Sequence, residues 1–231
     1  MPVADTSPRL VRAARRCVTV LALGAAVLSS AGCQRSLTAV RESGERAYRE
    51  GNYTLARSEF EEYLGRSPGN PFVTHMLGKT YIQTGQTSDA RERLLVAYSM
   101  RPEDDEIFES LCDGLLADHK YEELNRVLRQ RTIDRGRMKD YMLLAHYAQL
   151  TGDDDEAQRA LLTAARVDRG MSIEPQLELA KLYMKAGDRT RAVDRLRAAY
   201  FIDPKNGEVA QLAASLGEVV GPSFGSVPEE R

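Results

Sequence analysis

The chain has 231 residues, of which 29% are charged, 42% are hydrophobic, 6% are aromatic and none is tryptophan. Its hydrophobic residues are rich in alanine and leucine, which are good helix formers, and β-branched residues are scarce, a composition that favours helices over strands. The formal net charge of −2 gives no global reason to expect a nucleic acid as a partner. Cys17, Cys33 and Cys112 match neither a zinc spacing nor a disulfide framework, and the three histidines lie far apart, so we expect no metal site and no cofactor.

The first residues have the pattern of a secretory signal peptide. Arg9, Arg12, Arg15 and Arg16 precede an apolar run at 17–28, and small residues follow it. This run is short for a membrane span, which needs about 20 residues. We therefore expect the protein to be exported.

Residues 28–33, Leu-Ser-Ser-Ala-Gly-Cys, resemble a bacterial lipobox, whose cysteine is acylated after cleavage before it. Ser30 departs from that pattern, which usually has leucine there. The resemblance implies that Cys33 is lipidated and anchors the chain to a membrane in the periplasm or cell envelope. Gln34 in place of aspartate favours the outer over the inner membrane. Two alternatives stay open, namely cleavage to a free secreted protein and an uncleaved N-terminal anchor.

From Leu37 onward, a helix–turn–helix pattern recurs along the chain. Gly51 and Gly85 are 34 positions apart, Gly152 and Gly187 are 35 apart, and Gly85 and Gly152 are 67 apart, close to two periods. Each glycine separates two amphipathic segments, and such a pair cannot bury its apolar faces without neighbours. A 34-residue helix–turn–helix period is the length of the tetratricopeptide repeat.

The residues inside these units resemble those of tetratricopeptide repeats. In the clearest copy the small, aromatic and proline positions of the family fall on Gly78, Tyr81, Ala90 and Pro102. The third copy is degenerate, because His119 replaces the turn glycine. The resemblance implies an all-α fold, a right-handed superhelix (α-solenoid) of five repeats at about 37–70, 71–104, 105–137, 138–171 and 173–206. After them we expect a capping helix at 207–217 and a disordered tail at 218–231.

Several residues have structural roles in this interpretation. Gly78 is small, which lets two helix backbones approach closely. Cys112 occupies the equivalent position in the third copy, so we expect it to be a buried packing residue rather than a reactive thiol. We expect the helix N-caps to include Asn70, Asp153 and Asp188.

The sequence carries no glycine-rich phosphate loop, nucleophile elbow or paired zinc ligands, so we expect no enzyme. The acidic runs at 103–106 and 153–156 fall at predicted helix N-termini, where the helix dipole favours carboxylates. A basic cluster is expected to be a solvated charged face, with contact to anionic lipid or an acidic partner as the alternative. It contains Arg126, Arg129, Arg131, Arg135, Arg137 and Lys139.

The remaining candidate for a binding surface is the concave face. In tetratricopeptide proteins the first helix of each pair lines this face, and its non-packing positions contact a peptide or a partner helix. Phe72, Ile82, Met142 and Met184 predict a partly apolar groove, because a soluble helix normally avoids such residues when nothing covers them. The alternative is a groove without a ligand, or one covered by the chain's own N-terminus. The resemblance places on this face Arg41, Glu45, Tyr48, Phe72, His75, Lys79, Ile82, Glu109, Asp113, Leu116, Met142, His146, Gln149, Leu177, Lys181 and Met184.

These features predict that the partner is a protein, rather than a nucleic acid or a small-molecule substrate. We expect a non-enzymatic scaffold or assembly factor anchored at a bacterial membrane. In layout it resembles the small tetratricopeptide lipoproteins of pilus, secretion or outer-membrane assembly machines. The alternative is a soluble periplasmic chaperone, or a regulatory subunit of an enzyme complex, without an anchor.

Overall fold

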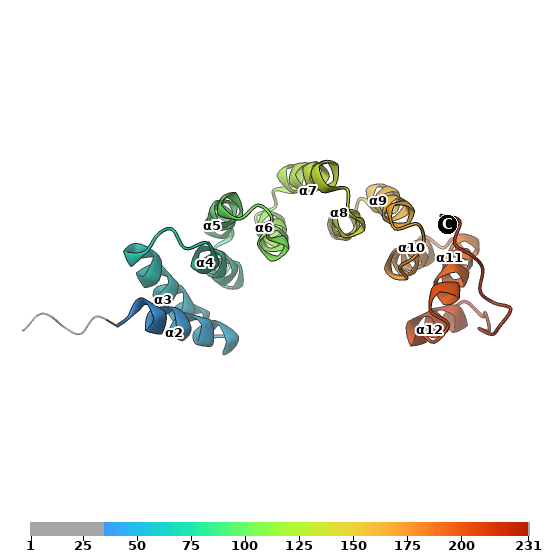
Figure 1. Ribbon diagram of the computed structural model, residues 1–231, viewed down its shortest axis with the longest axis horizontal. Coiled ribbons are helices and arrows are strands. Elements are labelled where there is room, and N and C mark those ends of the chain that lie inside the picture. Colours follow the sequence, from blue (N-terminus) through green and yellow to red (C-terminus); the bar gives the residue numbers. More distant parts are fainter. Residues whose placement is uncertain (1–34, 231) are drawn as a thin grey trace, which may run out of the picture. The chain divides into compact units, whose positions relative to one another are not determined.

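The computed structural model describes residues 35–230, and these fold into eleven α-helices joined by short turns (Figure 1). The chain divides into two compact units, Met1–Val73 and Thr74–Arg231. No strand lies within the described range. The all-α repeat fold predicted from the sequence is thereby confirmed. None of the helices between 35 and 230 is long and apolar enough to cross a membrane.

The first unit contains α2 (Leu37–Arg49), α3 (Tyr53–Arg66) and the beginning of α4 (Pro71–Gln83). Gly44 lets α2 and α3 approach closely, because a Cβ there would lie 2.7 Å from Cε1 of the buried Phe60. The predicted cap at Asn70 is confirmed, since its Oδ1 accepts from the Val73 backbone N–H at 3.1 Å.

The second unit contains the rest of α4 and the remaining helices. Figure 1 shows α6, α8 and α10 along one side of this unit, with α7 and α9 along the other. Two of the predicted caps begin helices here, Asp153 at α9 and Asp188 at α11. In chain order the helices are α5 (Thr87–Met100), α6 (Asp105–Ala117), α7 (Tyr121–Arg135), α8 (Met138–Leu150), α9 (Asp154–Val167), α10 (Glu174–Lys185), α11 (Arg189–Ile202) and α12 (Gly207–Ser215).

The turn between the two helices of a pair requires a left-handed residue. Gly85 has φ +74° in the second pair, a conformation that glycine adopts without steric cost. In the degenerate third pair His119 adopts the same conformation, with φ 56°. The His119 Nδ1 lies 2.7 Å from the Tyr121 hydroxyl. The helix–turn–helix geometry therefore persists where its usual glycine is missing.

Leu94 of α5 is the centre of the packing at the start of the second unit. It is fully buried, and a Cβ on Gly78 of α4 would lie 2.6 Å from its Cγ. A Cβ on Gly114 of α6 would lie 2.8 Å from its Cδ1. Cys112 is fully buried, as predicted, and burial raises the pKa of its thiol.

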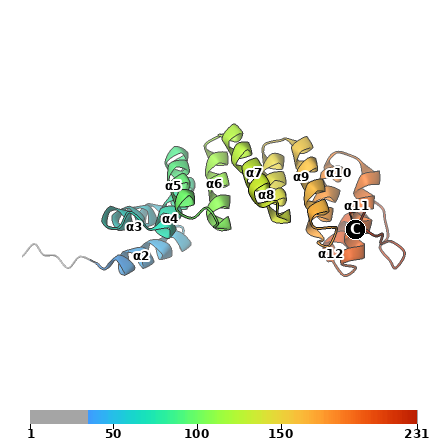
Figure 2. The same ribbon diagram turned by 45° about the horizontal axis from the view of Figure 1, so that its top comes forward.

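The last residues depart from the predicted disordered tail. Residues 217–230 run beside α11 in both views (Figure 1, Figure 2). Phe224 is buried against the edge of the Tyr200 ring, with centroids 5.6 Å apart, and Arg195 holds Glu230 at 2.5 Å. The physical reason is that α12 has no second helix to cover the core. Phe224 covers it instead, packing in a cluster with Leu177, Ala180, Leu196, Ala199, Val209 and Ala213.

Candidate functional site

The first helices of the pairs in the second unit present side chains that packing does not use. We call this surface the groove face and define it by the residues that α4, α6, α8 and α10 place on it. Glu109, Asp113 and His146 are exposed, whereas Ile82, Met142 and Met184 are half-buried. The full set is Lys79, Ile82, Glu106, Glu109, Asp113, Leu116, Met142, His146, Gln149, Glu174, Glu178, Lys181 and Met184.

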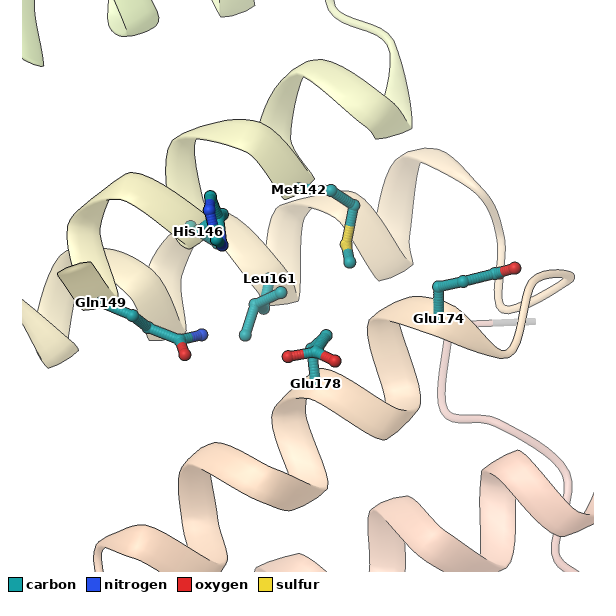
Figure 3. A pocket seen from close by; sticks show the side chains of 7 residues that line it. Met142, His146, Gln149, Leu161, Glu174 and Glu178 are labelled. Carbon is teal, nitrogen blue, oxygen red and sulfur yellow. The ribbon is translucent and has the colours of Figure 1, made fainter. Parts of the chain in front are cut away.

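A pocket of about 310 Å³ lies on the groove face between α8 and α10. Figure 3 shows Met142, His146 and Gln149 on one helix and Glu174 and Glu178 on the other, on opposite sides of the opening. Leu161 of α9 and Ala145 of α8 also line it. The pocket therefore combines apolar and acidic walls.

Two lysines of the groove face are held by glutamates. Lys181 Nζ lies 2.7 Å from Glu178 Oε1 and 2.8 Å from Glu208 Oε1. Lys79 Nζ lies 3.2 Å from Glu106 Oε1. Burial alone would lower the pKa of Lys181, but its hydrogen bonds to the two glutamates outweigh burial and raise that pKa.

Tyr147 joins α8 to α6 beside this face. Its hydroxyl donates to Asp113 Oδ1 at 2.7 Å and lies 3.1 Å from the backbone oxygen of Glu109. Burial and the hydrogen bond to Asp113 raise the pKa of Tyr147, so the phenol stays protonated. The contact fixes Asp113 but leaves its carboxylate charge without a cationic partner among residues 35–230.

Glu109, Glu174 and His146 are exposed on the groove face, where their polar groups can contact a binding partner. Within the described chain, neither the Glu109 nor the Glu174 carboxylate has an ion pair. The His146 ring packs in a T-shaped arrangement with the Tyr147 ring, with centroids 5.2 Å apart. These side chains are the part of the groove face that intramolecular packing leaves unused.

The structure corrects the prediction that His75 lies on the concave face. It is only 3% exposed, and its Nε2 lies 2.8 Å from the Ser110 Oγ. Burial lowers the pKa of His75, and the charge of Lys79 adds to that effect. The residue is a packing residue because α6 lies over it, so it does not face a groove. Leu177 is also buried, in the cluster around Phe224.

Four residues of the predicted site belong to the first unit and are described by themselves. Arg41 and Glu45 pair along α2 at 3.3 Å. Tyr48 is half-buried, with its ring 5.4 Å from that of Tyr53, and Phe72 is 43% exposed. Cys33 lies outside the described residues.

The basic cluster is largely an internal network, which corrects the predicted solvated face. Arg131 is 4% exposed and pairs with the buried Asp140, Nε to Oδ1, at 3.0 Å. Arg131, Arg135, Arg137 and Lys139 all bond to Asp105 at the start of α6. Burial alone would raise the pKa of Asp105, but hydrogen bonds from Lys139 and Arg137 lower it well below its usual range. Arg126, Arg129 and Lys139 have side chains that are more than half exposed.

The acidic runs behave as helix starts rather than metal sites. Asp104 caps α6 by accepting from the backbone N–H groups of Glu106 and Ile107, and Asp153 caps α9. Across residues 35–230 no group of three or more His, Cys, Asp or Glu is arranged to hold a metal ion.

Sequence reasoning missed Glu174 and Glu178 as groove residues. They precede and follow Leu177, which the repeat alignment placed on the concave face. The signal that identifies them is their own spacing, because residues four apart share one helix face, and this face of α10 looks towards α8.

Comparison with known proteins places the fold among tetratricopeptide proteins. Residues 47–111 match the tetratricopeptide repeat family. The chain is similar to the solved tetratricopeptide protein TTC0263 of Thermus thermophilus, with 21% identity, a TM-score of 0.51 and coverage of 78% of this chain and 98% of that one. It is also similar to PilF of Pseudomonas aeruginosa, with 17% identity, a TM-score of 0.54 and coverage of 78% and 82%.

A third solved structure is YrrB, described as a tetratricopeptide protein with an unusual peptide-binding site. It is 15% identical, with a TM-score of 0.50 and coverage of 76% of this chain and 90% of that chain. No curated protein matches the sequence. At these identities the likeness establishes the tetratricopeptide fold.

Proposed function

We propose that this protein is a non-enzymatic interaction scaffold, or assembly factor, that binds a protein partner on the groove face of its second unit. The observation that carries the proposal is the pocket of about 310 Å³ between α8 and α10, which the half-buried Met142 and the exposed His146 and Glu174 line. Methionine is unbranched and polarizable, so Met142 and Met184 suit a surface that adapts to an extended peptide or a helix.

The proposal includes a membrane anchor at Cys33. It is supported by the basic start, the short apolar run and the small residues before that cysteine. Acyl chains stabilise membrane residence by about 0.8 kcal/mol for each buried methylene, so more than one chain holds a soluble domain firmly. We place the protein in the cell envelope, at the outer membrane, where it serves an assembly machine of the pilus, secretion or outer-membrane type.

Site-specific photo-crosslinking in the producing cell tests the partner-binding part. A photoreactive amino acid at position 146 is expected to capture a protein partner, because the His146 side chain is exposed at the pocket mouth. The matched control carries the same amino acid at position 126, where Arg126 is exposed on α7 with its side chain 73% accessible. Equal capture at the two positions, or capture at position 126 alone, contradicts the proposal.

Metabolic labelling with a tagged fatty acid tests the anchor. The wild-type chain is expected to take up label and to fractionate with membranes, and Cys33→Ser is expected to lose both properties. Unlabelled wild type in the soluble periplasmic fraction favours the alternative of a soluble chaperone or regulatory subunit. Equal labelling of both chains rules out acylation at Cys33.

A further inference from the structure

The groove face of the second unit has an excess of negative charge once its own ion pairs are formed. Both of its lysines are already held, Lys79 by Glu106 and Lys181 by Glu178 and Glu208. Glu109, Asp113 and Glu174 then remain without a cationic partner among residues 35–230. The charge on this face is local, because the whole chain has a formal net charge of only −2.

We propose that the partner segment bound on the groove face is basic, and that one of its lysine or arginine side chains enters the pocket between α8 and α10. This inference rests on the proposed function and names the chemistry of the partner. The head group of the entering side chain lies at Glu178, its stem lies along Met142 and Leu161, and Glu174 adds negative charge at the rim.

The two kinds of wall in the pocket match the two parts of such a side chain. Lysine and arginine bury an apolar stem while keeping the charged head at polar groups. Met142, Ala145 and Leu161 supply apolar surface, Glu178 places its carboxylate at the opening, and Glu174 stands at the rim with its carboxylate directed outward (Figure 3). The volume of about 310 Å³ is at the lower end of the range for small-molecule sites, about 300–1,000 Å³, and is suited to a single long side chain.

Glu109 and Asp113 extend the negative charge from the pocket to α6. They are four residues apart and therefore share one face of that helix, and both are exposed. Tyr147 holds the Asp113 carboxylate in place by its hydrogen bond of 2.7 Å. A segment with several basic residues meets negative charge at both α6 and α10, whereas an acidic segment is repelled at both.

The binding of defined peptides to the full chain tests this inference. The probe is a short fluorescein-labelled peptide in which arginine alternates with alanine and leucine. The control peptide has citrulline in place of arginine, which preserves shape and removes charge. The double variant Glu174→Gln with Glu178→Gln removes charge at the pocket, and Glu92→Gln with Glu122→Gln removes the same charge at exposed positions of α5 and α7.

The arginine peptide is expected to bind the wild type at least about tenfold more tightly than the citrulline peptide, a difference of about 1.4 kcal/mol. The pocket variant is expected to lose about that factor, and the surface-charge control is expected to change by less than about twofold. Raising the salt concentration is expected to weaken only the arginine peptide, because salt screens exposed charges. Circular dichroism checks that both double variants remain helical.

Equal binding of the two peptides, or equal loss in the pocket variant and the surface-charge control, overturns the inference. The photo-crosslinker at position 146 separates this failure from failure of the proposed function. Capture there of a native partner through an uncharged or acidic segment leaves protein binding intact and overturns the basic-partner inference. If the peptides do not bind and no native partner is captured at position 146, both the proposed function and the basic-partner inference are contradicted.

Discussion

Arg131 and Asp140 form an ion pair that is buried on both sides, with Nε 3.0 Å from Oδ1 and side chains only 4% and 2% exposed. The Arg131 guanidinium also lies over the Phe108 ring, 4.0 Å from its centroid. Asp105 extends the pair into a network that joins the starts of α6 and α8 to the end of α7. This network holds the third pair of helices, whose sequence departs furthest from the repeat pattern.

Replacing Asp140 by asparagine is expected to destabilise the protein by about 1.5–3 kcal/mol, because it removes the buried charged partner of Arg131 and leaves only the more exposed Asp105 paired with it. The free energy of unfolding from urea denaturation measures this effect. The matched control is Asp134→Asn on α7, where an exposed carboxylate accepts a hydrogen bond from Gln130 Nε2 at 2.8 Å. We expect that control to change stability by less than about 0.5 kcal/mol, and equal losses in the two variants argue against a structural role for the buried pair.

The buried His75 is expected to cause a loss of folding stability in acid that is separate from the loss caused by the carboxylates. Burial lowers its folded-state pKa, so unfolding takes up a proton and stability falls as pH drops below the unfolded value of 6.5. Asp105 and Asp140 also have lowered folded-state pKa values. Their stabilisation is present above their unfolded pKa and is lost only at lower pH, from about 4 downward.

Melting temperatures measured from about pH 8 to about pH 3 separate the two components, because the reference pKa values of histidine and of carboxylates lie in different parts of this range. His75→Gln retains a hydrogen-bonding side chain towards Ser110 but does not titrate. We expect this variant to lose the decline just below pH 6.5 and to keep the steeper decline at lower pH. A variant profile that parallels the wild type throughout contradicts the assignment to His75.

Gly78→Ala is expected to cost about 1–3 kcal/mol, because the added methyl group lies 2.6 Å from Cγ of the buried Leu94 and forces it to move. Chemical denaturation provides the measurement. Gly65→Ala in α3 is the control, since a Cβ there meets nothing within 4 Å and alanine is the better helix former. Gly65→Ala is expected to be neutral or stabilising by up to about 1 kcal/mol, and a loss there comparable to that at Gly78 refutes the overpacking explanation.

Phe224→Ala is expected to release residues 217–230 from α11. A buried phenylalanine contributes about 1.5–3 kcal/mol, so amide hydrogen exchange in that segment is expected to accelerate roughly ten- to hundredfold. Val227→Ala is the control, because Val227 is 58% exposed in the same segment. If both variants exchange at the wild-type rate, Phe224 does not anchor the segment.

The repeat units were predictable because their spacing and their small residues act locally. Gly85 terminates one helix and Gly78 admits Leu94, and both effects are visible within one unit of the sequence. His75 was misplaced because its burial depends on Ser110, which lies 35 positions further along. A prediction made within one repeat contains no information about which side chain of the next repeat lies over it.

The misread charges and tail have a related cause. Arg131 looked like part of a solvated face because its partners, Asp105 and Asp140, lie on two other helices. The glycines, prolines and serines after Gly217 predicted disorder, whereas Phe224 covers a core that α12 leaves open. Both errors follow from contacts between elements, which local composition does not encode.

Binding on the groove face is the central claim, and the dissociation constant of the crosslinked partner tests it most directly. The measurement compares the wild type with Met142→Ala combined with His146→Ala, and uses Ile133→Ala on α7, a residue 76% exposed, as the control. We predict at least about tenfold weaker binding for the groove variant, with an unchanged melting temperature, and less than about twofold change for Ile133→Ala. Equal affinity of the groove variant and the wild type contradicts the claim.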